Sequence, residues 1–243
     1  MKDIIYFRCH VPEDAVDLKC RIYVLCDAAE DGIVVGAYSG FLKSDLTWSC
    51  NNILGRGLLA PEEWTITRKE LGALNVASNV KAVVERALGD WLGNIYVGGD
   101  SEVALCWCSY ENVKLATFHR NRVNNIKAKV DLNQLIHVPG ASNPCDIGTR
   151  PDSVTAASVL PNSPWMSGKD WMIKSYGEAI EDNDIKTIQQ MKLSKEAKKD
   201  LKEGIVFDAF QEDETHVAIA SVNVVDVQKV KENERFLIIY FHP

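Results

Sequence analysis

Four acidic residues stand where the sequence changes from an apolar run to a turn or to a helix start. Any one of them could simply cap a helix or face solvent at a strand end, because helix starts favour acids. Brought together at one edge of a fold, four carboxylates would repel one another unless cations lay between them. Ligand sets made only of oxygen suit Mg²⁺ or Mn²⁺, and two such ions can support hydrolysis of a phosphodiester. The four residues are Asp27, Glu70, Asp100 and Asp146.

The elements that must position these acids begin with three strands. The runs RIYVLCDAA (21–29), IVVGAYSGFL (33–42) and LTWSCNNIL (46–54) are apolar and contain many β-branched residues. Asp31-Gly32 gives a turn between the first two strands, and Lys43-Ser44-Asp45 gives a turn between the second and the third. Short connections of this kind predict an antiparallel meander.

A long helix follows the meander. Thr67 through Glu70 has the pattern of a capping box, and Gly89 is a plausible stop. Between them, apolar residues mark one face at helical spacing: Leu71, Leu74, Ala77, Val80 and Val84. The later predicted elements are a strand at 94–99, a helix from Asp100-Ser101 through Trp107, a helix at 115–130, a strand at 134–138 and a short helix opened by Asn143-Pro144.

This order of elements predicts an α/β fold with a five-stranded mixed sheet flanked by helices. In such a sheet the ends of the first and fourth strands can be neighbours, which would bring Asp27 close to Asp100. The two helix starts that carry Glu70 and Asp146 could then lean over that edge. The chain has 243 residues and is 46% hydrophobic, which is enough for one substantial core.

Composition excludes several classes of protein. No apolar run is long enough to span a membrane, and MKDIIYFRCHVPED at the amino terminus lacks the apolar segment of a signal peptide. We therefore expect an intracellular chain without a membrane partner. The seven cysteines include no CxxC pair, which favours reduced and buried thiols. A net charge of −7 argues against loose, charge-driven binding of nucleic acid, but not against a site whose acids are held by metal ions.

The chain changes in character after Arg150. Residues 151–172 are rich in Pro and Ser and contain two tryptophans, which is typical of a segment that wraps around a domain. Residues 185–204 are charged and helix-prone, and the runs 215–227 and 235–241 look like strands. We therefore expect a domain at 1–150, a wrapping C-terminal extension at 151–175 and an appendage or linker at 176–243.

Five segments occur in the order CDAAEDGIVVGAY, TRKELGAL, GGDSEVALCW, FHRNRVNNI and HVPGASNPCDIGTR. Together they resemble the ribonuclease H domain of BEL/Pao-type LTR retrotransposon polyproteins, and the resemblance covers roughly residues 4–172. The sequence departs from the family pattern without losing an acid. His137 lies on a strand, unlike the mobile histidine of many cellular ribonucleases H, so we interpret it as structural. The departures are Ala29, Gly99, Cys145 and Thr149.

This resemblance implies an RNase H-like fold and an enzyme, an endoribonuclease that cleaves the RNA strand of RNA–DNA hybrids during reverse transcription. It implies that Asp27, Glu70, Asp100 and Asp146 hold two Mg²⁺ ions, with Mn²⁺ as a substitute. The implied partners are the RNA–DNA hybrid and adjacent reverse transcriptase and integrase domains of a polyprotein. The implied location is the cytoplasm, within virus-like particles.

Two alternatives stay open. Lys114, Arg120 and Arg122 are candidates for contacts with substrate phosphates, because basic side chains match phosphate oxygens, but they could equally be solvated helix charges. The function could also be that of a catalytically inactive RNase H-like module that serves as a structural connection or interaction domain. A transposase or integrase with this fold is disfavoured, because the later glutamate helix and the long spacer expected there are missing.

Overall fold

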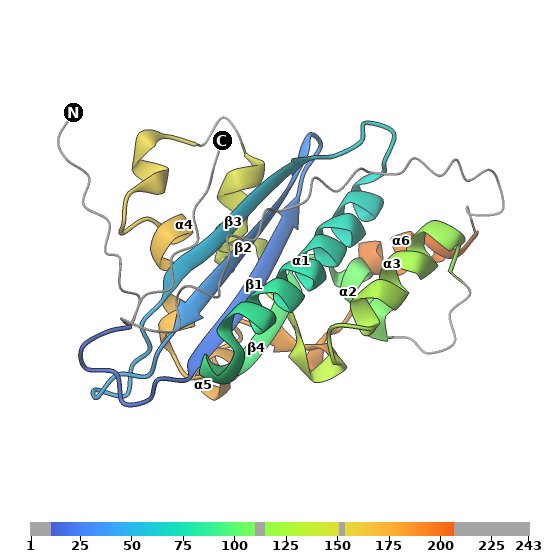
Figure 1. Ribbon diagram of the computed structural model, residues 1–243. Coiled ribbons are helices and arrows are strands. Elements are labelled where there is room, and N and C mark those ends of the chain that lie inside the picture. Colours follow the sequence, from blue (N-terminus) through green and yellow to red (C-terminus); the bar gives the residue numbers. More distant parts are fainter. Residues whose placement is uncertain (1–10, 110–114, 151–153, 207–243) are drawn as a thin grey trace.

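A six-stranded mixed sheet runs through the computed structural model, which describes residues 11–109, 115–150 and 154–206 (Figure 1). The strand order is β3-β2-β1-β4-β5-β6. The first three strands form the predicted antiparallel meander, β4 and β5 continue the sheet in parallel to β1, and β6 is antiparallel to β5. The strands are β1 (Cys20–Ala28), β2 (Gly32–Gly40), β3 (Asn51–Leu59), β4 (Leu92–Gly99), β5 (Leu135–His137) and β6 (Lys186–Thr187).

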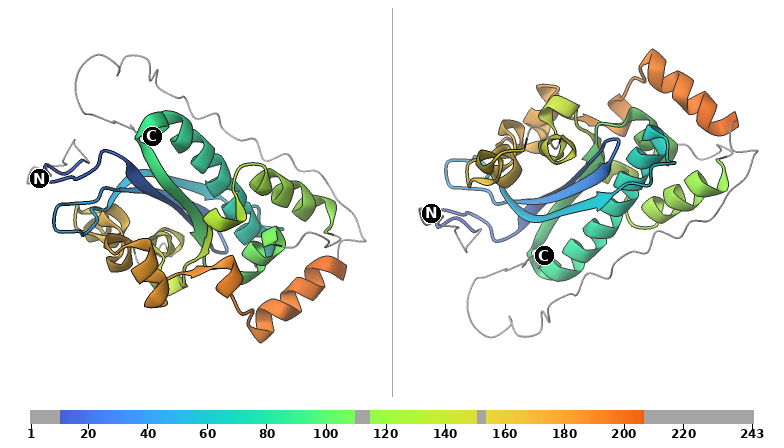
Figure 2. Two further views of the ribbon diagram at one scale, coloured as in Figure 1. Left: turned by 90° about the horizontal axis from the view of Figure 1, so that it is seen from below. Right: turned by 90° about the horizontal axis from the view of Figure 1, so that it is seen from above.

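Helices cover both faces of this sheet (Figures 1 and 2). The longer ones, α1 (Ile66–Leu88), α2 (Glu102–Ser109) and α3 (Thr117–Lys127), lie together on one face, and α6 (Lys195–Val206) packs beside α2. The short elements are α4 (Pro164–Ser167), α5 (Tyr176–Glu181) and 3-10 turns that include η1 (Gly89–Trp91), η2 (Leu132–Gln134), η3 (Gly140–Ser142), η4 (Pro144–Thr149), η6 (Ala156–Val159), η7 (Asp170–Ile173) and η8 (Ile188–Gln190).

The main core lies between α1 and the sheet. All five apolar positions predicted for the inner face of this helix are buried, and they pack with β1 residues such as Ile22 and Val24. The helix ends where the sequence predicts, at Gly89, whose φ of 50° is a backbone conformation that side chains disfavour. Trp107 from α2 is fully buried in the same core. These contacts fix α1 against β1, the strand that carries the first acid.

The opposite face of the sheet is covered by the chain beyond residue 150. Tyr23 and Leu25 of β1 point to this face, where they meet Trp171 and Met172. Arg21 lies on the same face and is only 3% exposed. Its Nη2 donates to the backbone oxygens of Met172 and Lys174, at 2.8 Å in both cases. Its guanidinium also stacks on Trp48, 4.0 Å from the ring centroid. The extension is therefore fastened to the sheet by a buried cation.

Residues 176–185 also belong to this packing, whereas residues 188–201 pack against the core on the α1 side. Ala179 of α5 and Ile185 are fully buried on the extension side, and β6 pairs with β5. The sheet therefore has six strands and not the five predicted, because a strand of two residues leaves no periodic pattern in a sequence. Ser175, where we expected the wrapping extension to end, is the N-cap of α5. The strands predicted at 215–227 and 235–241 lie outside the described residues.

Two local predictions were wrong. The third strand was expected at 46–54 but runs from Asn51 to Leu59, because Asp45 accepts hydrogen bonds from the amide and hydroxyl of Thr47 and holds that stretch in a turn. The first helix begins earlier than expected. Its N-cap is Thr65, whose side chain accepts from the Arg68 amide, so Glu70 lies in the second turn and completes no capping box. Within the described residues, no helix is both long and apolar enough for a membrane span.

Candidate active site

The parallel pairing of β1 with β4 places two of the acids side by side. Leu25 pairs with Gly98, so Asp27 and Asp100 each follow that pair by two residues at the same edge of the sheet. Asp27 is still within β1 and is only 7% exposed, whereas Asp100 comes directly after β4. The neighbourhood predicted for the first and fourth strands is therefore present.

Glu70 reaches this edge from the second turn of α1. Its carboxylate accepts a hydrogen bond of 2.6 Å from the hydroxyl of Ser101, the residue that follows Asp100. The same hydroxyl oxygen accepts from the amide of Ala104 at 3.2 Å, so Ser101 also caps α2. One serine thus ties the helix of Glu70 to the turn of Asp100, and Asp27, Glu70 and Asp100 line a single small pocket.

The electrostatics of this pocket follow from burial and like charge. Burial raises the pKa of Asp100 to about 7, and the charges of Asp27 and Glu70 add to that rise. Burial also raises the pKa of Glu70, against the hydrogen bond from Ser101. Burial likewise raises the pKa of Asp27, against a hydrogen bond from Thr149 and together with the charge of Asp146. Three carboxylates that disfavour their own ionisation form a site in which a cation would be stabilised.

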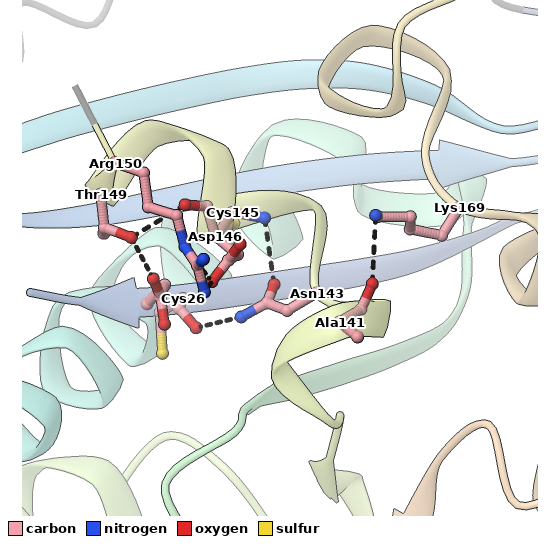
Figure 3. Close-up of polar contacts among 9 residues, drawn as sticks. Cys26, Ala141, Asn143, Cys145, Asp146, Thr149, Arg150 and Lys169 are labelled. Atoms are coloured by element: carbon pink, nitrogen blue, oxygen red, sulfur yellow. Dashed lines mark hydrogen bonds and ion pairs between the residues drawn. The ribbon is translucent and has the colours of Figure 1, made fainter. Parts of the chain in front are cut away.

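Asp146 lies beside the pocket but does not line it. It sits in η4, whose N-cap is Asn143, as the sequence predicts (Figure 3). Its Oδ1 accepts from Nε and Nη2 of Arg150, at 3.0 and 2.7 Å, so the carboxylate is turned toward that guanidinium. Its charge nevertheless contributes to the raised pKa of both Asp27 and Asp100. All four predicted acids therefore share one edge, three in the pocket and one beside it.

The turn of Asp146 is joined to β1 by side chains. The Asn143 amide donates to the backbone oxygen of Cys26 at 2.9 Å, and its Oδ1 accepts from the Cys145 amide at 3.1 Å (Figure 3). The hydroxyl of Thr149 donates to the Asp27 carboxylate. The residue at position 149, one of the departures from the family pattern, therefore retains a hydroxyl that reaches the first acid.

The donor chemistry of the edge fits hard divalent cations such as Mg²⁺, since every candidate ligand is a carboxylate oxygen. Among residues 11–109, 115–150 and 154–206, however, no three side chains of His, Cys, Asp or Glu converge closely enough to hold one ion. The carboxyl groups of Asp27 and Asp100 are nevertheless close enough to interact directly. The pocket thus has suitable donors, and two of them are adjacent.

Two residues of the HVPG segment support Asp100. His137 is buried, and its Nε2 donates to the backbone oxygen of Asp100 at 3.1 Å. Burial lowers the pKa of His137, against the nearby charge of Glu102, which favours the neutral ring. Gly140 also lies close to Asp100, and a Cβ at that position would lie 3.0 Å from its Oδ2. This placement supports the structural interpretation of His137.

The basic residues proposed for substrate contacts differ in their surroundings. Arg122 is half-buried, with its guanidinium 3.4 Å from the ring centroid of Phe118 and 4.9 Å from that of Trp64. Burial lowers the pKa of Arg122 to about 10, and the charge of Arg68 contributes. Arg120 is exposed and donates to the Thr117 hydroxyl at 3.1 Å. Lys114 lies outside the described residues.

Sequence reasoning missed the residues that hold the acids in place. Ser101 follows an acid at a helix start, so its capping role was detectable, but its bond to Glu70 depends on the tertiary fold. Arg150 stands four residues after Asp146, a spacing that could have suggested the ion pair. No local signal could have shown that Thr149 reaches Asp27, which lies 122 residues earlier.

The strand order and the helices on both faces define an α/β protein with an RNase H-like fold. Residues 2–101 match the family model described as the Pao retrotransposon-like RNaseH-like domain, which confirms the resemblance to Pao-type retrotransposon domains. That stretch contains Asp27, Glu70 and Asp100, while Asp146 lies beyond it.

No curated protein matches the chain. Among solved structures, RNase H1 from the halophilic archaeon Halobacterium salinarum NRC-1 is similar, with a TM-score of 0.31 and 16% sequence identity over 51% of this chain and 89% of that one.

Proposed function

We propose that this chain is the ribonuclease H of a Pao-type retrotransposon and hydrolyses the RNA strand of RNA–DNA hybrids with two Mg²⁺ ions. One observation carries the proposal: Asp27, Glu70 and Asp100, which are far apart in the sequence, line one pocket. Their raised pKa values favour a bound cation between them. Retention of all three acids also fits the family match over residues 2–101.

In this proposal the acids are ligands and not nucleophiles. Two bound Mg²⁺ ions would supply an activated water and stabilise the departing 3′ oxygen of the RNA. Asp27, Glu70 and Asp100 would hold them from the pocket, and Asp146 would complete the ligand set after leaving Arg150. Ser101 keeps Glu70 at the edge, and His137 keeps the backbone of Asp100 in place.

The proposed substrate is an RNA–DNA hybrid that an adjacent reverse transcriptase domain would supply. The other proposed neighbour in the polyprotein is an integrase domain. Such a chain would act in cytoplasmic virus-like particles. Selection of RNA over DNA requires a contact with the 2′-hydroxyl. Arg120, which is exposed, is the better placed of the two described arginines for a phosphate, because Arg122 is stacked on aromatic rings.

A second candidate is the catalytically inactive module. Two observations favour it: in the described part of the chain no three ligand side chains converge on one point, and Asp146 is paired with Arg150. If this second candidate is correct, the acids hold no catalytic ions and the protein does not cleave a hybrid. The two candidates therefore differ in a simple assay.

The test is cleavage of a labelled RNA–DNA hybrid with and without Mg²⁺, alongside RNA–RNA and DNA–DNA duplexes of the same sequence. We expect Mg²⁺-dependent cleavage of the RNA strand of the hybrid only, and its loss in Asp100→Asn. Asp90→Asn changes an exposed acid in η1 and is the matched control, which should cleave like the parent. Equal, metal-independent signals from the parent and Asp100→Asn would reject the enzyme in favour of the inactive module.

A further inference from the structure

The turn that carries Asp146 is held from outside by the chain beyond residue 150. The backbone oxygens of Ala141 and Ser142, just before the turn, both accept hydrogen bonds from that extension. Lys169 Nζ donates to Ala141 at 3.2 Å, and the indole Nε1 of Trp171 donates to Ser142 at 2.9 Å (Figure 3 shows the lysine contact). A short 3-10 turn has few internal hydrogen bonds, so such contacts contribute much of its order.

Trp171 is itself fixed to the strand of the first acid. It is 3% exposed, and its ring packs edge-on against Tyr23 of β1, with 4.9 Å between centroids and an interplanar angle of 73°. The next residue, Met172, has its backbone oxygen held by Arg21 of the same strand. These contacts fix the position of the indole relative to β1, and from that position it donates its hydrogen bond to Ser142.

The inner side of the turn is joined to that same strand. Asn143 donates to Cys26, and the thiol of Cys145 donates to the backbone oxygen of Leu25 at 3.2 Å. The turn is thus enclosed between β1 beneath it and Trp171 beside it. Both sets of contacts therefore fix the position of the turn relative to β1, the strand that carries Asp27.

We propose that the extension is a working part of the acidic site, and that Trp171 is a positioning residue that sets Asp146 against Asp27. The inference rests on the proposed ribonuclease H function and adds a residue to it. Trp171 touches neither a candidate ligand nor the pocket. It acts through the Ser142 carbonyl, and Lys169 adds a weaker, exposed contact to the neighbouring carbonyl.

The first experiment needs neither metal nor substrate. Trp171→Phe keeps an aromatic ring against Tyr23 but removes the indole N–H, and Trp165→Phe is the same change in the same extension, over Gly55 of β3. We expect hydrogen exchange of the amides in 140–150 to become roughly three- to tenfold faster in Trp171→Phe, while β1 is unchanged. Trp165→Phe should match the parent. Unchanged exchange in Trp171→Phe would overturn the inference, whether or not the protein is a nuclease.

The second experiment asks whether Trp171 acts through Asp146. Mn²⁺ binding is measured by calorimetry, and hybrid cleavage as kcat and KM, for Trp171→Phe, Asp146→Asn and the double variant. We expect Trp171→Phe to weaken Mn²⁺ binding and to lower kcat by about three- to tenfold, with KM for the hybrid within about twofold of the parent. In the Asp146→Asn background both effects should disappear.

Effects of Trp171→Phe that persist at full size in the double variant would contradict a role through Asp146. Lys169→Met removes the exposed contact to Ala141 and is not expected to disturb folding, so it tests the same turn independently. It should also accelerate hydrogen exchange in 140–150, by about twofold. No shift in Lys169→Met, together with global loss of protection in Trp171→Phe, would also reject the inference. An inactive parent with accelerated exchange in 140–150 would reject only the proposed function.

Discussion

The candidate site has two parts that are built differently. Asp27, Glu70 and Asp100 are placed by the paired strands β1 and β4 and by the long helix α1, and they share a buried pocket. Asp146 is placed by a 3-10 turn, which single side chains and the extension hold in position, and it is paired with an arginine at the surface. The first part inherits its geometry from the backbone of the core. The second part depends on a few hydrogen bonds.

This difference teaches where adjustment can occur. Backbone hydrogen bonds and buried apolar packing resist displacement of the first three acids. The exposed ion pair of Asp146 is worth little free energy, so its carboxylate can change partners at small cost. We therefore expect the pocket to govern whether the protein acts at all, and the turn to tune how fast it acts.

The strongest test of this contrast compares two isosteric changes. Asp100→Asn should lower kcat for hybrid cleavage about a thousandfold, because several kcal/mol of metal-dependent stabilisation would be lost. Asp146→Asn should lower it only about tenfold. Single-turnover rates at saturating Mg²⁺ provide the measurement, and equal losses in the two variants would remove the distinction.

A second test uses one glycine beside each part of the site: Gly140 lies close to Asp100 of the pocket, and Gly148 lies in the turn of Asp146. Gly140→Ala places a Cβ 3.0 Å from the Asp100 carboxylate and should lower kcat about tenfold with little change in Tm. Gly148→Ala places one 2.9 Å from Val34 Cγ1, which should lower stability by about 1–3 kcal/mol but kcat by less than Gly140→Ala does.

Gly57→Ala is the control for both glycine variants, since nothing lies within 4 Å of a Cβ there. Thermal unfolding and kcat should be measured for all three proteins. A larger loss of kcat in Gly148→Ala than in Gly140→Ala would reverse the order that we assign to the two parts.

The pH dependence of stability should distinguish the two parts without any assay of function. Between 3.8 and about 7, folded metal-free protein keeps a proton on Asp100 that the unfolded chain releases. Stability contributed by this group is therefore lost as pH rises through that window. Tm of the parent relative to Asp100→Asn should fall between pH 5 and pH 8, by roughly 2–4 °C for each kcal/mol of repulsion.

Calorimetric or fluorescence melts of both proteins, in buffers of matched ionic strength, would measure that difference. Added Mg²⁺ should restore the Tm of the parent at pH 8, since a ligand that binds only the folded state stabilises it. A Tm difference that grows as the pH falls would show that the sign is wrong.

The smallest expected effect concerns Arg150. An ion pair at the surface contributes at most about 1 kcal/mol, so Arg150→Ala should lower the Mg²⁺ concentration for half-maximal cleavage by no more than about fivefold. Arg120→Ala, which removes an exposed arginine on α3, should leave this Mg²⁺ requirement unchanged. A higher Mg²⁺ requirement in Arg150→Ala would indicate that the arginine assists the site and does not compete with it.

Much of the sheet could be predicted because its strands are long apolar runs with short turns. The third strand was misplaced because the Asp45–Thr47 turn occupies the start of the run at 46–54, and the strand continues instead through Gly55, which leaves room for the ring of Trp165. The helix start was misplaced because Thr65 and Thr67 can both act as caps, and the sequence alone does not show which is used.

The candidate site was predictable to the extent that strand and helix ends determine it. The position of Asp27 beside Asp100 follows from parallel pairing. The partners of Asp146 do not follow, because the direction of a side chain in a turn depends on groups distant in the sequence. The hydrogen bonds from Arg21 to the extension could not be predicted either, because the sequence of an apolar strand does not show which carbonyl groups its arginine will bind.

The cover that the extension forms over the second face of the sheet restricts how the module can be excised. A fragment that stopped at Arg150 would expose Tyr23, Leu25 and Tyr38 to water, in one contiguous patch on adjacent strands. Patches of this kind promote self-association. Such a fragment should collect in inclusion bodies, so we expect a folded protein only when the sheet and its extension are produced together.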